Sequence, residues 1–195
     1  MASLTRRTNK REEVEREVLR ATEALLAGGA SFAELNVERI ATEAGISRTA
    51  FYFYFRDKRE LLMRLTEDVS GLLYTEAEGW WSGDTDLRTA LQRVVTLYQE
   101  HAPLLRAVVE TAAYDEPVAG FWRAILGRFV ESTRDRLESD PAFDLPAEQT
   151  AFLLCWMTER ACYQQIVQGR DLADPGFVTA LVAVWERGAY GRLPA

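Results

Sequence analysis

The sequence predicts an all-α protein of about nine helices, with a small N-terminal three-helix head on a larger helical body. Along most of the 195 residues, apolar side chains recur at steps of three and four, which is the spacing of a helix with one buried face. Capping residues precede these stretches, and Gly or Pro separates them. The segment 50–55 is the one stretch with strand-like composition.

The first predicted helix covers residues 10–27 and has a single apolar face. That face consists of Val14, Val18, Ala21 and Leu25. Asn9, with Glu12 three residues later, has the spacing of a capping box at the start of this helix. The pair Gly28-Gly29 ends it.

Two short helices are predicted between residues 36 and 55. Asn36 caps the first, which ends before Gly45, and Ser47 caps the second, which runs to about Phe55. The aromatic residues at 50–55 have high β propensity, but a strand here would have no partner strand. We therefore expect tertiary context to make this segment helical.

A long fourth helix begins at Asp57, where Glu60 completes a second capping-box pattern. Its apolar positions are Leu61, Leu62, Leu65, Val69 and Leu72. Five further helices are expected at residues 85–100, 103–113, 117–138, 147–168 and 175–190, the last opened by Asp174-Pro175. We place the boundary between two functional units inside the fourth helix, which gives a head of residues 1–62 and a body of residues 63–195.

Charge is distributed unevenly between these two units. The chain has a net charge of −7, yet residues 1–60 hold 11 basic and 10 acidic residues (+1), whereas residues 61–195 hold 12 and 20 (−8). The acidic total argues against a non-specific nucleic-acid coat, because phosphate binding needs clustered cations. Because the excess of acidic residues lies in the body, this argument does not apply to the head. The asymmetry indicates that head and body have different functions.

The chain has no feature of an exported or membrane protein. No apolar run approaches the roughly 18 residues of a membrane span, and no apolar segment follows the basic N-terminus. The two cysteines, Cys155 and Cys162, form neither a disulfide framework nor a metal-ligand pattern. We therefore expect a cytoplasmic protein without a membrane partner, a bound metal or a cofactor.

Residues 36–55 have the pattern of a helix-turn-helix, whose second helix enters the major groove of DNA. Gly45 suits the tight turn, since a left-handed backbone has little cost for glycine. In the second helix Phe51 and Phe55 are four residues apart and are expected to face inward. Arg48 on the opposite side could bind guanine O6 and N7 as a fork, which discriminates between bases by roughly 1–3 kcal/mol.

Other polar residues of this segment are suited to phosphate contacts. Ser47, Tyr54 and Lys58 could hold phosphate oxygens near the start of the second helix. The alternative is that the five aromatic residues of the segment are simply core. We expect this of Phe51 and Phe55 but not of Tyr52 and Tyr54, because a three-helix head cannot bury all five rings.

The run from Gly45 to Leu61 resembles the DNA-binding signature of the tetracycline-repressor (TetR) family, within a similarity that covers about residues 12–65. The resemblance implies an all-helical homodimer with a variable body that binds an inducer. It also implies base-reading roles for Arg48, Thr49 and Tyr52, and backbone contacts for Ser47, Phe53, Tyr54 and Lys58. Thr49 replaces a proline common in the family, and Glu38 stands where some members have a DNA-contacting arginine, which weakens any expectation of base contacts from the preceding helix.

A basic arm that includes Arg6 and Arg7 precedes the head. In most proteins such an arm is a solvated tail. Before a helix-turn-helix, contact with the minor groove or with phosphates is an equal alternative.

Two predicted helices of the body carry aromatic residues at helical spacing. One has Trp122, Leu126 and Phe129; the other has Phe152, Trp156, Glu159 and Tyr163. Glu159 interrupts an apolar stripe, where an unpaired carboxylate is costly. It either pairs with Arg160, Arg123 or Arg128, or points into a cavity as an orienting group for a ligand.

Within the TetR family, the body is similar to that of the ethionamide-resistance repressors in Met157-Thr158-Glu159-Arg160 and in Trp185. The resemblance implies a long hydrophobic ligand channel. It adds Cys155, Thr158 and Trp185 to the expected lining, with Thr158 in place of an asparagine that anchors ligands there.

The last two helices are the expected surface of a homodimer that closes a four-helix bundle. The stripe on residues 147–168 is Ala151, Cys155, Thr158, Cys162 and Ile166; that on residues 175–190 is Phe177, Ala180, Leu181, Val184 and Gly188. Cys155 and Thr158 are thus assigned to both the cavity and the dimer surface, and the sequence does not decide between them.

These features favour a regulator that binds a pseudo-palindromic operator in double-stranded DNA and, as a repressor, is released by a hydrophobic small molecule. The alternative is a helical binding protein or enzyme that retains a degenerate head. Catalysis is not expected, because His101 is the only histidine and no phosphate-binding loop or nucleophile elbow is present. The sequence does not specify the operator, the effector, or repression as against activation.

Overall fold

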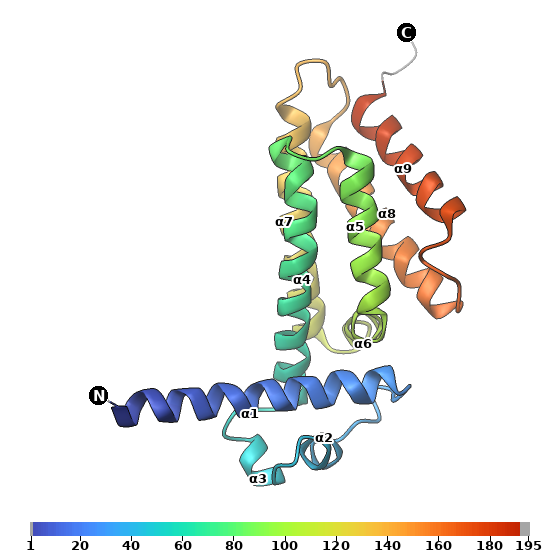
Figure 1. The fold of residues 1–195 in the computed structure, drawn as a ribbon. Helices are drawn as coiled ribbons and strands as arrows, with labels where there is room; N and C mark the ends of the chain where they lie inside the picture. The colour runs from blue at the N-terminus through green and yellow to red at the C-terminus, as the bar shows by residue number, and fades with distance from the viewer. Residues whose placement is uncertain (1, 192–195) are drawn as a thin grey trace.

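A computed structural model describes residues 2–191 of the protein, and this part of the chain consists of nine α-helices without a strand (Figure 1). The helices are α1 (Ala2–Ala27), α2 (Val37–Glu43), α3 (Arg48–Phe51), α4 (Lys58–Ser82), α5 (Leu87–Glu100), α6 (Ala102–Ala112), α7 (Glu116–Glu138), α8 (Ala147–Val167) and α9 (Pro175–Tyr190). The all-α prediction is confirmed. No helix among the described residues is long and apolar enough to cross a membrane.

Side-chain caps determine where most of these helices begin. Six N-cap side chains accept a hydrogen bond from the backbone N–H three residues later: those of Asn36, Ser47, Asp57, Asp86, Asp115 and Asp174. Each bond satisfies an amide that has no partner inside the helix. The caps predicted at Asn36, Ser47, Asp57 and Asp174 are confirmed.

Three local predictions are wrong. The first helix begins at Ala2, so that Asn9 lies inside it, because no Gly or Pro interrupts residues 2–9. Helix α3 ends at Phe51, not Phe55, since the chain turns through residues 52–54 and brings the two phenylalanine rings to a 5.4 Å centroid separation. In α4, Leu73 is buried whereas Leu72 is 51% exposed.

The head and the body share α4. In Figure 1, α1 lies across the lower part of the molecule with α2 and α3 beneath it, and α4 rises from the head into the body. There α5, α6 and α7 pack against α4, α8 packs against α7, and α9 packs against α5 and α8. The hydrophobic core runs through both parts, from Ile40 and Phe51 in the head to Val108 and Val182 in the body. One helix therefore connects the candidate sites of the two parts.

Candidate functional sites in the head and the body

The turn between α2 and α3 depends on Gly45. Its φ of +67° is left-handed backbone, a conformation that glycine adopts without steric cost. The Ile46 amide then donates to the Ala41 carbonyl at 2.9 Å, which folds the chain back onto α2. This geometry is that of a helix-turn-helix and sets α3 at the surface of the head.

The outer face of the α3 segment consists of side chains available to a partner. Arg48, Thr49 and Tyr52 are exposed, and the Phe53 ring is 76% exposed. Phe51 and Phe55 are buried in the core, as predicted, and Tyr54 is half-buried. A large apolar ring held in solvent beside an arginine at a helix start is the composition of a contact surface.

Ser47 has a structural role in addition to its predicted contact. Its Oγ accepts the hydrogen bond from the Ala50 amide at 3.0 Å. The hydroxyl proton is still available, so the same side chain can cap α3 and donate to a phosphate oxygen.

The structure gives Lys58 a role inside the head, and its predicted phosphate contact stays a prediction. Its ammonium group donates to the carbonyls of Phe32, Ala33 and Leu35 at 3.0, 3.0 and 2.9 Å and lies 5.1 Å from the centroid of the Phe32 ring. An ammonium has three donors, so a phosphate would have to displace one of these bonds. Burial lowers the pKa of Lys58. Lys58 thus fastens the loop after α1 to the start of α4.

Arg59, the residue after Lys58, connects the head with the body. Arg59 Nε donates to Asp115 Oδ2 at 2.8 Å, while Asp115 Oδ1 accepts from the Val118 amide at 3.2 Å as the N-cap of α7.

The basic arm is described in part. The backbone at Arg6 and Arg7 belongs to α1, and their side chains lie outside the described part of the structure.

The body contains a cavity lined by α4, α5, α7, α8 and α9. Seven predicted residues line it: Trp122, Leu126, Phe129, Cys155, Thr158, Glu159 and Trp185. The volume open to the centre of a water molecule is about 80 Å³, which admits a slim molecule only. A bulkier ligand would have to move the walls apart.

Two of the predicted lining residues lie elsewhere. Trp156 and Tyr163 border a separate cleft between α6, α7 and α8, where the Arg160 guanidinium lies 5.0 Å from the Tyr163 ring centroid. The error is one of helical phase, because the face of α8 that enters the core carries Cys155, Thr158 and Glu159.

The observed orientation of α8 also corrects part of the predicted dimer surface. Ala151, Cys155, Thr158 and Cys162 are buried within the subunit, so they belong to its core and cannot form a surface stripe. Leu181 of α9 is likewise buried, whereas Val184 is exposed. Cys155 and Thr158 line the cavity.

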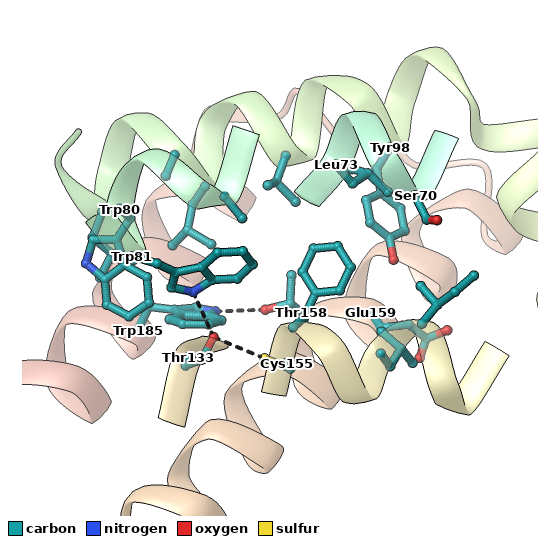
Figure 2. A pocket seen from close by; sticks show the side chains of 18 of the residues that line it. Ser70, Leu73, Trp80, Trp81, Tyr98, Thr133, Cys155, Thr158, Glu159 and Trp185 are labelled. Atoms are coloured by element: carbon teal, nitrogen blue, oxygen red, sulfur yellow. Dashed lines mark hydrogen bonds between the residues drawn. The ribbon is translucent and has the colours of Figure 1, made fainter. Parts of the chain in front are cut away.

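Sequence reasoning missed the wall that α4 and α5 supply. Trp80 and Trp81 near the end of α4, and Tyr98 of α5, line the cavity with Ser70 and Leu73 (Figure 2). The adjacent tryptophans in the sequence could have indicated this wall, since at least one of two such large apolar rings is expected to face the interior.

At one end of the cavity, the polar groups satisfy one another (Figure 2). Trp81 Nε1 donates to Thr133 Oγ1 at 3.1 Å, and Trp185 Nε1 donates to Thr158 Oγ1 at 2.7 Å. The Thr133 hydroxyl also lies 3.6 Å from Cys155 Sγ. This tryptophan end therefore presents an apolar wall.

At the other end, the Glu159 carboxylate has no hydrogen-bond partner on either oxygen, and neither has Trp122 Nε1. Arg160 Nε lies 3.6 Å from Glu159 Oε2, but its side chain is 52% exposed whereas that of Glu159 is 1% exposed. Burial raises the pKa of Glu159, and the charge of Arg160 and the Trp122 N–H oppose that effect. The carboxylate therefore lies near Arg160 and also lines the cavity, and its role as an orienting group for a ligand stays a prediction.

The neighbouring groups are neutral at physiological pH. Burial raises the pKa of Tyr98 well above its usual value, and it raises the pKa of Cys155 to about 11 and that of Cys162 to about 12. These thiols are therefore neither nucleophiles nor ready metal ligands.

A helix-turn-helix head with an exposed reading face, joined by α4 to a helical body with an internal cavity, defines the class of helical DNA-binding regulators. Residues 18–65 match the family described as "Bacterial regulatory proteins, tetR family", and residues 87–191 match "Transcriptional regulator EthR, C-terminal domain". The second match covers more than half of the chain. The protein therefore belongs to the TetR family of transcriptional regulators and has an EthR-type C-terminal domain.

Known relatives agree over nearly the whole length. The HTH-type transcriptional regulator EthR of Mycobacterium tuberculosis (strain ATCC 25618 / H37Rv) is 27% identical over 201 residues, which cover 95% of this chain and 92% of that protein. EthR of Mycolicibacterium smegmatis is 27% identical over 177 residues, covering 84% and 80%. These similarities indicate a regulator rather than an enzyme.

Solved structures share the fold. A TetR-family transcriptional regulator from Syntrophomonas wolfei superposes with a TM-score of 0.75 at 16% identity, covering 93% of this chain and 97% of that one. A TetR-like transcriptional regulator from Rhodococcus sp. RHA1 gives 0.67 at 24% identity, covering 92% and 97%.

Proposed function

We propose that the protein is a homodimeric transcriptional repressor in the cytoplasm, released from a pseudo-palindromic operator when a hydrophobic small molecule enters the cavity. The observation that carries this proposal is that α4 begins at the reading head and ends at the cavity wall, where Trp80 and Trp81 lie. A ligand that moves this wall acts on the element that carries the head. We treat residues 1–62 and 63–195 as the functional units.

In this proposal α3 enters the major groove. Arg48, Thr49 and Tyr52 read base edges, while Ser47, Phe53 and Tyr54 contact the sugar–phosphate backbone, and Arg6 and Arg7 reach the adjacent minor groove or its phosphates. The exposure of the α3 face and the polar start of the helix support these roles. Lys58 would contact a phosphate only by giving up one of its bonds to the carbonyls of Phe32, Ala33 and Leu35.

The dimer would use outward faces of α8 and α9. Leu153 on α8 and Val184 on α9 are exposed apolar residues, and covering them in a second copy would remove apolar surface from water. Two heads would then be held one turn of DNA apart, about 34–36 Å.

The ligand would couple to DNA through a difference in affinity. Ligand-free and ligand-bound bodies would hold the heads at different spacings, and coupling of this kind is typically about 1–3 kcal/mol. Because linkage is reciprocal, operator DNA must weaken ligand binding by the same factor.

Titration with DNA fragments from the flanking genome tests the proposal, with Arg48→Ala as the probe of base reading. We expect wild-type protein to select one fragment in a salt-sensitive manner, and Arg48→Ala to lose about 5- to 150-fold of that selectivity. Arg170→Ala removes the same charge from the exposed turn after α8 and should bind like the wild type.

If no flanking fragment is bound selectively, the proposed function is wrong. A protein that binds ligands in the cavity but selects no DNA would instead support the alternative, a helical binding protein with a degenerate head. Two results would contradict the repressor role. The first is that the protein fails to hold the selected DNA fragment when no ligand is present, and the second is that it activates the neighbouring gene.

A further inference from the structure

We propose that the cavity selects slender apolar amines, whose protonated nitrogen pairs with Glu159 while the apolar chain lies toward the tryptophan end. This inference rests on the proposed function in that it names the chemical class of the small molecule. It follows from the difference between the two ends of one cavity (Figure 2).

The tryptophan end offers no unused polar group. The indole N–H groups of Trp81 and Trp185 both donate to threonine hydroxyls, at 3.1 and 2.7 Å. The Thr158 hydroxyl in turn donates to the Leu154 carbonyl at 2.9 Å. A ligand gains little here from hydrogen bonds, because each partner is already engaged, and so this end favours an alkyl or aryl group.

The Glu159 end has unused capacity. Neither of its buried carboxylate oxygens accepts a hydrogen bond, although the unpartnered Trp122 N–H lies close to the carboxylate. Arg160 does not supply one, since its guanidinium lies over the Tyr163 ring on the outer side of α8 and comes no nearer than 3.6 Å. An unpartnered buried carboxylate is unfavourable, and a ligand that supplies donors to it removes that cost.

The charge of the lining determines which donor fits. Among the cavity-lining residues of the described chain none is Lys, Arg or His, so nothing there would neutralise a ligand carboxylate or phosphate. An anionic head would also be repelled by Glu159. A protonated amine brings three donors and the opposite charge, so it stabilises the ionised form of the carboxylate.

Aromatic rings near the carboxylate add to the same preference. Tyr98 and Trp122 line the cavity beside Glu159, and ring faces attract cations. The small free volume favours a single unbranched chain on the nitrogen. Together these features describe a primary alkylamine better than an alcohol, an acid or a bulky ring system.

The test uses the full-length protein without DNA and three matched probes at concentrations below micelle formation: dodecylamine, dodecanol and dodecanoate. Tryptophan fluorescence reports binding, because four tryptophans line the cavity. At pH 7 we expect dodecylamine to bind at least about tenfold more tightly than either of the other probes. Equal affinities, or tighter binding of dodecanoate, would overturn the proposal using the wild-type protein alone.

Glu159→Gln identifies the residue responsible. It should reduce the preference for the amine over the alcohol to within about twofold, while leaving dodecanol binding unchanged, because the variant keeps the shape of the side chain but not its charge. Glu110→Gln removes one negative charge from the surface pair with Arg106 and should keep the full preference. A preference that survives Glu159→Gln, or that is lost equally in Glu110→Gln, would show that the acidic surface and not the cavity attracts the amine.

These outcomes are separate from those of the proposed function. If dodecylamine shows the expected preference but does not weaken binding of the selected DNA fragment, the proposed release mechanism fails and the ligand class stands. If another compound releases the DNA and the amine preference is absent, the ligand class fails and the regulator stands.

Discussion

The head and the body solve opposite problems with the same kind of secondary structure. In the head, the short helices α2 and α3 begin at side-chain caps, Lys58 fastens the loop before α2, and Arg48, Thr49 and Tyr52 face solvent. In the body, helices of 11 to 25 residues surround a cavity, and the polar groups without partners face inward. The head thus presents a fixed contact surface on α3, whereas the body has buried polar groups without hydrogen-bond partners.

Charge makes this difference sharper. Residues 1–60 carry a net +1, whereas residues 61–195 carry −8. An acidic body repels the phosphate backbone, so that only the head can approach the duplex closely. The overall acidity therefore restrains non-specific binding and leaves selective binding to the head.

The largest effect is expected from Lys58→Met, which removes three hydrogen bonds from the small head. We expect the free energy of unfolding to fall by about 2 kcal/mol, since bonds from a charged donor are among the stronger ones. DNA of every sequence should be bound less well, because the loop and α4 are no longer joined. Chemical denaturation and DNA titration measure both.

Lys58→Arg separates this role from a phosphate contact. The planar guanidinium cannot point three donors at three carbonyls as an ammonium does, so stability should remain low. If the arginine variant binds DNA like the wild type and is equally stable, the three hydrogen bonds of Lys58 are not needed to hold the head together.

The next effect is expected in the body and has the opposite sign. Glu159→Gln should raise the free energy of unfolding by about 1 kcal/mol at pH 7, because a buried charge without a hydrogen bond, whose nearest cation is the half-exposed Arg160 at 3.6 Å, is replaced by a neutral amide. Burial raises the pKa of Glu159 above its ordinary 4.5, so the folded state holds the proton more tightly than the unfolded state does. Wild-type stability should therefore decline as the pH rises above 4.5.

The variant should lack that part of the pH dependence, as measured by thermal unfolding between pH 4 and pH 8. Identical pH profiles for the two proteins would mean that the carboxylate finds a partner that the structure does not contain among its described residues.

The smallest effect concerns the connection between the two parts. Arg59→Gln and Asp115→Asn each break the ion pair between α4 and the start of α7, while asparagine can still cap α7. A double-mutant cycle on unfolding should give a coupling energy below about 1 kcal/mol, since the pair is partly exposed. Strictly additive effects would mean that the pair does not join head and body energetically.

Local chemistry explains what the sequence predicted well. A cap requires only residues three positions apart, so Asn36, Ser47 and Asp57 could be identified without knowledge of the fold. The inward positions of Phe51 and Phe55 follow similarly from one helical turn and the small size of the head.

The errors arose where tertiary packing decides. Trp156 and Tyr163 share a stripe with Glu159 when the helix is drawn alone, but in the packed bundle only Glu159 of these three lines the cavity. Lys58 was assigned to phosphate from its side-chain type and from its place in the family signature, and nothing local shows that the carbonyls of residues 32–35 lie within its reach. Long-range partners of this kind require the fold.

The unbroken α4 also acts as a lever arm. Its 25 residues at about 1.5 Å per residue make a rod of about 37 Å, so a rotation of about 5° about its cavity end would carry the head by about 3 Å. In a dimer, two such displacements in opposite directions would change the distance between the heads by about 6 Å, against a half-site spacing of about 34–36 Å. A small movement of Trp80 and Trp81 that tilts α4 would thus produce a larger displacement of the head, because the head lies at the other end of this long helix.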